Sequence, residues 1–506
     1  MTQFATPLVA AFAIALAVAA IIEVPGLRTG LNFADEGYLW YGTQQVLNGR
    51  VPIRDFRAYD PGRYYWCALF CLIFGRRNLS LRLAMLALRV VTLALAAWLI
   101  HRATGDLLAT AFWTLALGAC SPPWYKQTEV FFSVAAVATA TLFIEAPTFA
   151  MHAVTGGFAG LSLLFGLNLA LYNAAGLVGT WLFAIARSGY EGSTPLLWFT
   201  AGVLAGLSPS VVMFATVPAL WRAYWRHKVL PVLGRGSANL RVPIPWLWRP
   251  TPPQVAGPLY HKRVVKIGFT ALPLFYLAMF GWLLLRPPPD SPWVGVATAS
   301  ACIGACYMHY AMSRADPEHL WLAFAPFVIG IASVSPRGGL GALLAVCAAI
   351  TAFGSVHASV NEAVLRRRHP DWFTRYQVGS DEFWLLKDSV DRLESIREAV
   401  EAHTREGDPV LFVPLLVTLY PLWSRRIPIY DMFCVHAAAP GAEDAMIDSL
   451  EREHVRLAVV WNAALDGLEE RRFSRTHPQV WRYLECEFEP IRLISPHVDF
   501  HCFVRP

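Results

Sequence analysis

The most informative shortage in this sequence is charge. Only 15% of the 506 residues are Asp, Glu, Lys or Arg, whereas 56% are hydrophobic. Soluble globular proteins carry about 25% charged residues, so a polar surface cannot cover the whole chain. The shortage is uneven, because residues 1–360 contain long runs almost free of charge and residues 361–506 have an ordinary charge density. We therefore expect a membrane part of about 360 residues followed by a soluble part of about 145.

Other missing features exclude whole classes of function. The net charge of +6 is modest and the Arg residues are scattered, which argues against a nucleic-acid partner. A cytosolic domain that binds a nucleotide-sugar donor would require a Gly-rich phosphate loop or a similar motif. The sequence contains neither such a loop nor a Walker lysine motif. The nine Cys have no metal-ligand spacing, so we expect no cofactor, although acidic side chains could bind a divalent metal. Two of Cys434, Cys486 and Cys502 could pair if the soluble part lies outside the cytoplasm.

The long apolar runs predict an α-helical polytopic membrane protein. A crossing helix needs about 20 mostly apolar residues. The expected spans are 7–24, 81–100, 107–123, 129–146, 156–171, 174–187, 195–210, 264–285, 292–312, 319–335 and 339–356. The first is interpreted as an anchor, because no small-residue cleavage site follows it. Tyr172-Asn173 with Gly176 is the most plausible break in the long apolar stretch 156–187.

Eleven crossings would place the two termini on opposite sides of the membrane. The positive-inside rule counts Lys and Arg in short loops, and the Arg residues between Arg50 and Arg77 would put the first loop in the cytoplasm. We expect the opposite orientation, because these Arg residues lie among polar and aromatic residues with a functional character. The first loop is therefore predicted to be extracytoplasmic.

The first loop, residues 25–80, is expected to contain two helices. Asp35 can cap a helix over 36–48 that ends at Gly49. Asp60 can cap a second helix that begins at Pro61 and ends at Gly75. This second helix is too short to cross and strongly aromatic, which is typical of a helix at the membrane interface.

An adjacent carboxylate pair, Asp35-Glu36, opens the first of these helices. A helix cap plus a first-turn acid would explain the pair by local energetics alone. A cap needs only one carboxylate, however, and charges at the membrane boundary are costly unless they are paired or used. Both interpretations remain open from the local sequence.

The order of motifs in this loop resembles the C-superfamily of glycosyltransferases, which includes the protein O-mannosyltransferases and the lipid A aminoarabinose transferases. The matching residues are Asp35-Glu36-Gly37-Tyr38, Asn48-Gly49-Arg50-Val51-Pro52, Pro61, Tyr65-Trp66, Phe74-Gly75 and Arg82. The resemblance implies an extracytoplasmic loop and a sugar donor linked to polyprenyl phosphate. It also implies transfer to an acceptor hydroxyl on a glycan, lipid or protein, with inversion at the sugar. Asp35 would be the general base, Glu36 would position acceptor or sugar, and Tyr38 would contact substrate.

Two further polar connections are expected on the same side. Glu129, close behind Lys126, stands where similar enzymes carry a second acid, although an acid near a helix N-terminus needs no function. Arg314, Asp316 and His319 form an Arg-x-Asp-x-x-His loop like that of similar bacterial enzymes. Arg314 could bind a phosphate bidentately, with the other two orienting it or the sugar, or Arg314 and Asp316 could form a local salt bridge.

The sequence departs from the aminoarabinose transferases at one point. These enzymes carry a Lys near the outer end of the fifth span, where it meets the lipid phosphate, but residues 171–174 here contain no cation. Phosphate binding would then depend on Arg314, on Arg57 or Arg63, or on Lys126. A transporter or flippase for a lipid-linked glycan, and a non-catalytic glycan-binding protein, remain the competing functions.

The remaining segments are expected to frame the site. Residues 211–262 mix aromatic, Pro and Arg residues, which is typical of an interfacial helix and an extended cover. In residues 361–506, short apolar runs at 410–413, 427–430 and 457–461 alternate with helices near 414–424 and 442–454, which predicts a small α/β domain. We expect this domain to lie extracytoplasmically and to shape the acceptor site. The whole protein is expected in a bacterial inner membrane.

Overall fold

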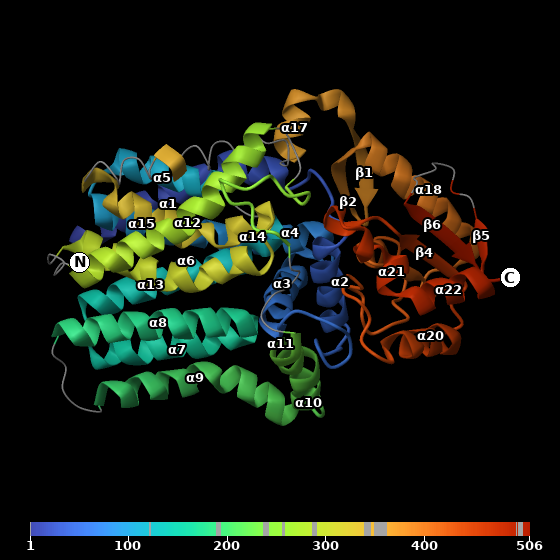
Figure 1. The fold of residues 1–506 in the computed structure, drawn as a ribbon, viewed down its shortest axis with the longest axis horizontal. Helices are drawn as coiled ribbons and strands as arrows, with labels where there is room; N and C mark the ends of the chain where they lie inside the picture. Colours follow the sequence, from blue (N-terminus) through green and yellow to red (C-terminus); the bar gives the residue numbers. More distant parts are fainter. Residues whose placement is uncertain are drawn as a thin grey trace. The chain divides into compact units, whose positions relative to one another are not determined.

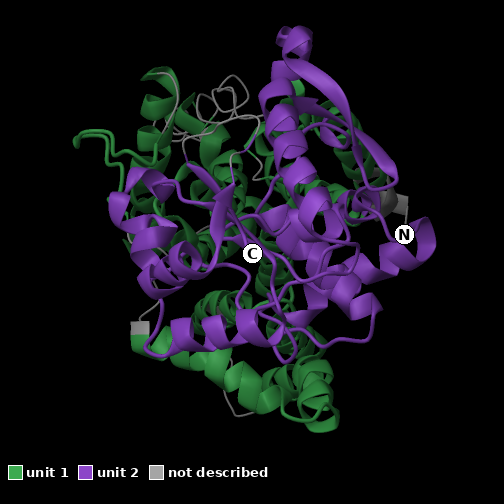
Figure 2. Cartoon of the chain, turned by 90° about the vertical axis from the view of Figure 1, so that its right-hand side faces the viewer, with its two compact units in different colours: residues 1–25, 84–364 green, residues 26–83, 365–506 purple. Residues whose placement is uncertain are grey.

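The computed structural model divides the chain into two compact units (Figure 2). Unit 1 contains residues 1–25 and 84–364, and unit 2 contains residues 26–83 and 365–506. The first loop thus forms one unit with the C-terminal residues. The structure describes residues 2–120, 123–188, 194–235, 242–255, 259–285, 291–337, 346–348, 362–491, 493 and 499–506.

All the regular secondary structure in the described residues of unit 1 is helical. Its longer helices are α1 (Thr2–Ile22), α4 (Asn78–Thr104, whose first residues belong to unit 2), α5 (Leu107–Ala119), α6 (Gln127–Glu145), α7 (Phe149–Phe165), α8 (Leu167–Ser188), α9 (Thr194–Thr216), α12 (Leu259–Leu285), α13 (Pro292–Ser313) and α15 (Phe324–Val334). Helix α13 lies in the middle of the core, packed against α6, α8, α12 and α15. Helix α7 packs against both α8 and α9 (Figure 1).

The helical membrane architecture expected from the sequence is confirmed, but the number of crossings is not. Among the described residues, six helical segments are long and apolar enough to cross: 8–26, 78–104, 124–145, 167–186, 194–216 and 259–285. The predicted spans 107–123 and 156–171 correspond to helices shorter than 18 residues. Most of the predicted span 339–356 lies outside the described residues.

The predicted span 319–335 is divided into α14 (Pro317–Leu322) and α15. The two helices meet at Ala323, which ends one and precedes the other. Pro326 explains the interruption, because it has no N–H to donate to the carbonyl of Leu322 four residues earlier.

The apolar stretch 156–187 forms two helices as predicted, but the break lies elsewhere. Helix α7 ends at Gly166, whose extended backbone (φ 175°, ψ 130°) interrupts the helix. The expected break at Tyr172-Asn173 and Gly176 falls inside α8 instead. Gly176 has a packing role there, because a Cβ at this position would lie 2.7 Å from Ile303 Cδ1.

The segment after α9 turns through short helices: α10 (Leu220–Tyr224), a π-helical turn over Trp225–Val229, and α11 (Leu230–Arg235). Phe214 near the end of α9 packs against the rings of Trp221 and Tyr224. The described residues after 241 have no regular structure until α12. Short helices followed by residues without regular structure match the predicted order of elements, and their position at the membrane interface stays a prediction.

In unit 2, the first loop folds into α2 (Asp35–Leu47) and α3 (Pro61–Phe74), which pack against each other. The helix ends follow the predicted signals. Pro61 occupies the first turn of α3, and Gly49 and Gly75 adopt positive φ angles of 80° and 93° that L side chains rarely adopt. The predicted capping by side chains is wrong, because Asp35 is the first residue of α2 and not its N-cap, and Asp60, the N-cap of α3, makes no capping hydrogen bond.

The C-terminal part of unit 2 opens with α17 (Glu362–Arg368), which begins just before the boundary, and a hairpin of β1 (Phe373–Val378) and β2 (Asp381–Leu386). Gly379 supplies the positive φ of the two-residue turn. The hairpin edge also binds the first loop, since Gly30 N–H donates to Trp384 O at 2.9 Å and Trp384 N–H donates to Arg28 O at 2.8 Å. Helix α18 (Lys387–His403) follows directly.

The predicted α/β domain is a four-stranded mixed sheet in the order β3-β4-β6-β5. The strands are β3 (Leu411–Val413), β4 (Leu457–Trp461), β5 (Glu489–Ile491) and β6 (Phe500–Val504), and the helices are α19 (Leu419–Leu422), α20 (Ala442–Arg452), α21 (Phe473–Thr476) and α22 (Pro478–Glu487). Strands β3 and β4 are parallel, whereas β6 pairs antiparallel with both β4 and β5. The run 427–430 is not a strand; a single bridge joins Pro409 to Arg426 beside it. Cys434, Cys486 and Cys502 are all free thiols.

Candidate functional site

The start of α2 is built around Asn32. The Asn32 side-chain oxygen accepts hydrogen bonds from the backbone N–H groups of Ala34 (3.0 Å) and Asp35 (2.8 Å). This is the Asx-turn geometry that Asn offers to a helix N-terminus. Thr418 fixes the same turn, because its hydroxyl donates to Asn32 O at 2.6 Å and its N–H to Phe33 O at 2.9 Å. The first residue of α2 is therefore held in place without using its own carboxylate.

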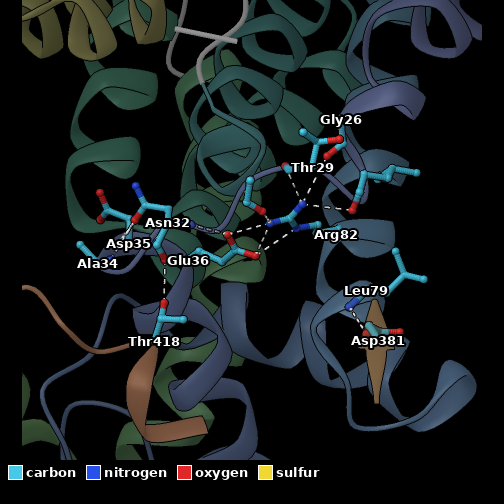
Figure 3. Close-up of polar contacts among 12 residues, drawn as sticks. Gly26, Thr29, Asn32, Ala34, Asp35, Glu36, Leu79, Arg82, Asp381 and Thr418 are labelled. Carbon is cyan, nitrogen blue, oxygen red and sulfur yellow. Dashed lines mark hydrogen bonds and ion pairs between the residues drawn. The ribbon is translucent and has the colours of Figure 1, made fainter. Parts of the chain in front are cut away.

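Glu36 and Arg82 form a buried ion pair beside this turn (Figure 3). The guanidinium contacts both carboxylate oxygens, with Nη2 at 2.9 Å and 3.0 Å and Nε at 3.0 Å from Oε1. The side chains of Glu36 and Arg82 are 0% and 1% exposed. The guanidinium also donates to loop carbonyls, those of Gly26, Leu27, Thr29 and Gly30.

This geometry gives Glu36 a role different from the one expected. Its carboxylate has no exposed surface, and it accepts a further hydrogen bond from Asn32 N–H at 3.0 Å. In place of the expected contact with sugar or acceptor, Glu36 therefore has a structural role. Together with Arg82 it holds the loop that carries Asp35. An Arg in the first turn of a span needs a partner, and this signal could have identified the pair from the sequence.

Asp35 is turned the other way. Figure 3 shows its side chain pointing away from Arg82, whereas Glu36 points toward it. The Asp35 carboxylate is half-buried and accepts a hydrogen bond from the Tyr59 hydroxyl at 2.7 Å. The two adjacent acids thus separate into one buried structural carboxylate and one that retains exposed surface.

The other predicted residues of this loop surround Tyr59. Tyr38 is buried, and its ring lies edge-on to that of Tyr59 with centroids 4.7 Å apart. Burial raises the pKa of Tyr38 well above its ordinary value, so its hydroxyl stays protonated. Arg63 is buried with its guanidinium 4.9 Å from the Tyr59 ring centroid. Arg57 forms an ion pair with Asp431.

In unit 1, the predicted loop residues Arg314, Asp316 and His319 do come together. Arg314 Nε lies 2.7 Å from Asp316 Oδ2, and His319 Nδ1 lies 2.8 Å from Asp316 Oδ1. Asp316 also caps α14 by accepting from His319 N–H at 2.9 Å. Burial opposes ionisation of Asp316, but the hydrogen bond and charge of His319 and the Arg314 cation hold its pKa below the ordinary value. Arg314 keeps 26% of its side chain exposed.

Glu129 and Lys126 lie where α6 begins. Glu129 is in the first turn of α6 and is buried. Lys126 is half-buried, with its ammonium 5.9 Å from the Tyr125 ring centroid. Among the described residues, no group of three or more His, Cys, Asp or Glu side chains is arranged to hold a metal ion.

The stretch without a cation, 171–174, has an ionisable neighbour that sequence reasoning missed. The Tyr172 hydroxyl lies 2.5 Å from Nδ1 of His309 on α13. Next to it, buried Asn173 joins the two helices by accepting from the Tyr307 hydroxyl at 3.0 Å. Only the packing of α8 against α13 brings these residues together.

Comparison with known proteins relates this arrangement to one fold. The chain matches the crystal structure of ArnT from Cupriavidus metallidurans bound to undecaprenyl phosphate, with a TM-score of 0.55. The match covers 99% of this chain and 98% of ArnT at 14% sequence identity. The chain has the ArnT fold. The fold that the resemblance implied is confirmed by this match.

ArnT from the same organism in the apo state also matches, with 13% identity, coverage of 99% and 98%, and a TM-score of 0.46. No family model matches the sequence, and no curated protein sequence matches it. The ArnT fold therefore rests on the similarity to the structure bound to undecaprenyl phosphate, which extends over nearly the whole chain.

Proposed function

We propose that this protein is a membrane glycosyltransferase that moves a sugar from a polyprenyl-phosphate carrier to an acceptor hydroxyl. The observation that carries the proposal is the setting of Asp35 at the start of α2, in a chain that has the ArnT fold. Its half-buried carboxylate opens α2 on a turn fixed by Asn32, Thr418 and the buried Glu36–Arg82 pair. A rigid carboxylate with exposed surface is what a general base requires. The ArnT structure bound to undecaprenyl phosphate supports the class of carrier.

In this reaction, Asp35 takes the proton of the acceptor hydroxyl as its oxygen attacks the anomeric carbon. The bond between that carbon and the phosphate oxygen breaks, and the polyprenyl phosphate leaves with the bonding electrons. Displacement in a single step inverts the configuration of the sugar. The departing group gains negative charge, so a nearby cation lowers the barrier. On the strength of its sequence motif we propose Arg314 for this role, and its side chain is partly exposed and paired with Asp316.

The remaining predicted residues have supporting roles in this proposal. Glu129 would orient the sugar or acceptor, and Lys126 would add positive charge for the phosphate. Arg57 forms an ion pair with Asp431, and the Arg63 guanidinium lies over the Tyr59 ring. Both are therefore weaker candidates for phosphate binding. We propose that the first loop, Asp35 and the C-terminal domain are extracytoplasmic, and that the protein resides in a bacterial inner membrane. No metal is required in this scheme.

The test is to incubate purified protein with a panel of labelled polyprenyl-phosphate sugars and a mixture of candidate acceptors. Release of free polyprenyl phosphate together with a glycosylated product would support the proposal and identify the sugar. If no donor is consumed but labelled lipid moves between the leaflets of reconstituted vesicles, the protein is a transporter. If donor binds and is neither consumed nor moved, it is a binding protein.

A further inference from the structure

The structure points to Tyr59 as a positioning residue for Asp35. We infer that the Tyr59 hydroxyl fixes the orientation of the Asp35 carboxylate and stabilises its ionised form, so that Tyr59 sets the pH range of the reaction. This inference rests on the proposed function. Tyr59 follows no motif and lies 24 residues from Asp35, in the irregular segment between α2 and α3.

Tyr59 is held from three sides. Its backbone N–H donates to the hydroxyl of Tyr64 at 2.9 Å, and Tyr64 is fully buried at the start of α3. Its ring meets that of Tyr38 at an interplanar angle of 82°. Arg63 lies over the ring at 4.9 Å. A hydroxyl on so constrained a ring can approach Asp35 from only one direction.

The direction of the hydrogen bond decides its effect. The Tyr59 O–H donates to Asp35 Oδ1 at 2.7 Å, and a donor to a carboxylate favours the charged form. The Arg63 cation over the ring draws electron density from the phenol, which makes its O–H a better donor. Only Oδ1 takes this bond from Tyr59, and Oδ2 is the oxygen that we assign to the acceptor proton.

Several titratable and charged groups surround Tyr59 and Asp35 within unit 2. They are Glu36 and Tyr38 on α2, Arg57 and Asp60 in the loop, Arg63 and Tyr64 on α3, and Asp431 in the C-terminal part. Glu36 is paired with Arg82 and Asp431 with Arg57. Burial raises the pKa of both tyrosines well above 10, so they stay neutral. The Tyr59 hydroxyl donates directly to Asp35, so its removal acts first on the Asp35 carboxylate.

The test compares pH–rate profiles of kcat/KM for the purified full-length enzyme and Tyr59→Phe. Phenylalanine keeps the ring and its packing but removes the donor, so the ionised form of Asp35 loses stabilisation. We expect the acid limb of the profile to move upward by about one pH unit, with a smaller change at the plateau. Tyr483→Phe is the matched control, because its hydroxyl also donates to a carboxylate, Glu451, at 2.5 Å elsewhere in unit 2. The control should leave the profile unchanged.

A second variant gives a shift of opposite sign. Replacing Tyr59 by a fluorinated tyrosine makes the hydroxyl a stronger donor and should move the acid limb to lower pH. An acid limb that coincides with that of the wild type in both variants would overturn the inference. Asp35→Asn separates the two claims: if it retains full transfer, the proposed base is wrong. If it is inactive while both Tyr59 variants keep the wild-type acid limb, only the role of Tyr59 is wrong.

Discussion

Replacing Glu36 by Gln should cost far more stability than an ordinary loss of a surface ion pair. The change preserves the shape of the side chain but leaves the Arg82 guanidinium, 1% exposed, without its counter-charge. Removing one partner of a buried pair costs about 3–5 kcal/mol. We expect about 3 kcal/mol, because the amide oxygen can still accept from Arg82 and the loop carbonyls keep their donor.

A matched exposed pair provides the control. Arg375 and Glu382 lie 3.1 Å apart on the β1–β2 hairpin of the same unit, with side chains 62% and 50% exposed. Glu382→Gln should therefore change stability by only about 0.5 kcal/mol. In a unit of about 200 residues, about 3 kcal/mol corresponds to a midpoint lower by roughly 6–12 °C. Thermal unfolding of both variants in one detergent measures the difference, and equal midpoints for the two would refute this account of the pair.

The other predictions concern a close backbone contact and a titrating helix cap. Gly37→Ala should destabilise the start of α2, because the new Cβ would lie 2.1 Å from Thr418 N. Gly26→Ala is the control and should be tolerated, because a Cβ there meets nothing within 4 Å. Thermal unfolding measures both variants, and equal midpoints would contradict the close contact at Gly37. Asp316 has a lowered pKa in the folded state, so its contribution to stability is present above about pH 3.9 and is lost as the pH falls through the lower folded value. The stability difference between wild type and Asp316→Asn should accordingly shrink on acidification, and a difference that does not depend on pH would show that the Arg314–Asp316 contact contributes nothing through charge.

Local signals in the sequence were sufficient to predict where several helices begin and end. Pro61 begins α3 because its missing N–H costs nothing in the first turn. Gly49 and Gly75 follow α2 and α3 because each adopts a positive φ. The charge deficit likewise identified the helical membrane part. These features depend on a residue and its immediate neighbours, so no knowledge of the packing was needed.

Contacts between distant residues could not be predicted in the same way. Glu36 was predicted to position acceptor or sugar, because its partner Arg82 lies 46 residues away and the need of an Arg in a span for a counter-charge does not say which acid supplies it. Tyr59 carried no motif, and its role depends on a hydroxyl brought to Asp35 by the packing of α2 against α3. The same holds for Tyr172 and His309, which only the packing of α8 on α13 joins.

Two features of the fold left signals that sequence reasoning did not use. Gly379 stands in a two-residue turn between runs whose buried and exposed residues alternate, which is a hairpin pattern. Gly166 ends α7, but the break was predicted at Tyr172-Asn173, because polar residues are rare in apolar stretches. Asn173 is instead buried and bonded to Ser162 at 2.8 Å and to Tyr307.

The most direct test of the account is the rate of polyprenyl-phosphate release by Asp35→Asn, measured with the donor and acceptor found for the wild type. Loss of a general base should reduce the rate by about 10²–10⁴-fold. The thermal midpoint should stay close to the wild-type value, because the turn at Asp35 is held through backbone N–H groups and Asn32. Asp55→Asn, another acid of the same loop, should keep its activity. Transfer by a folded Asp35→Asn variant at the wild-type rate would contradict the central claim.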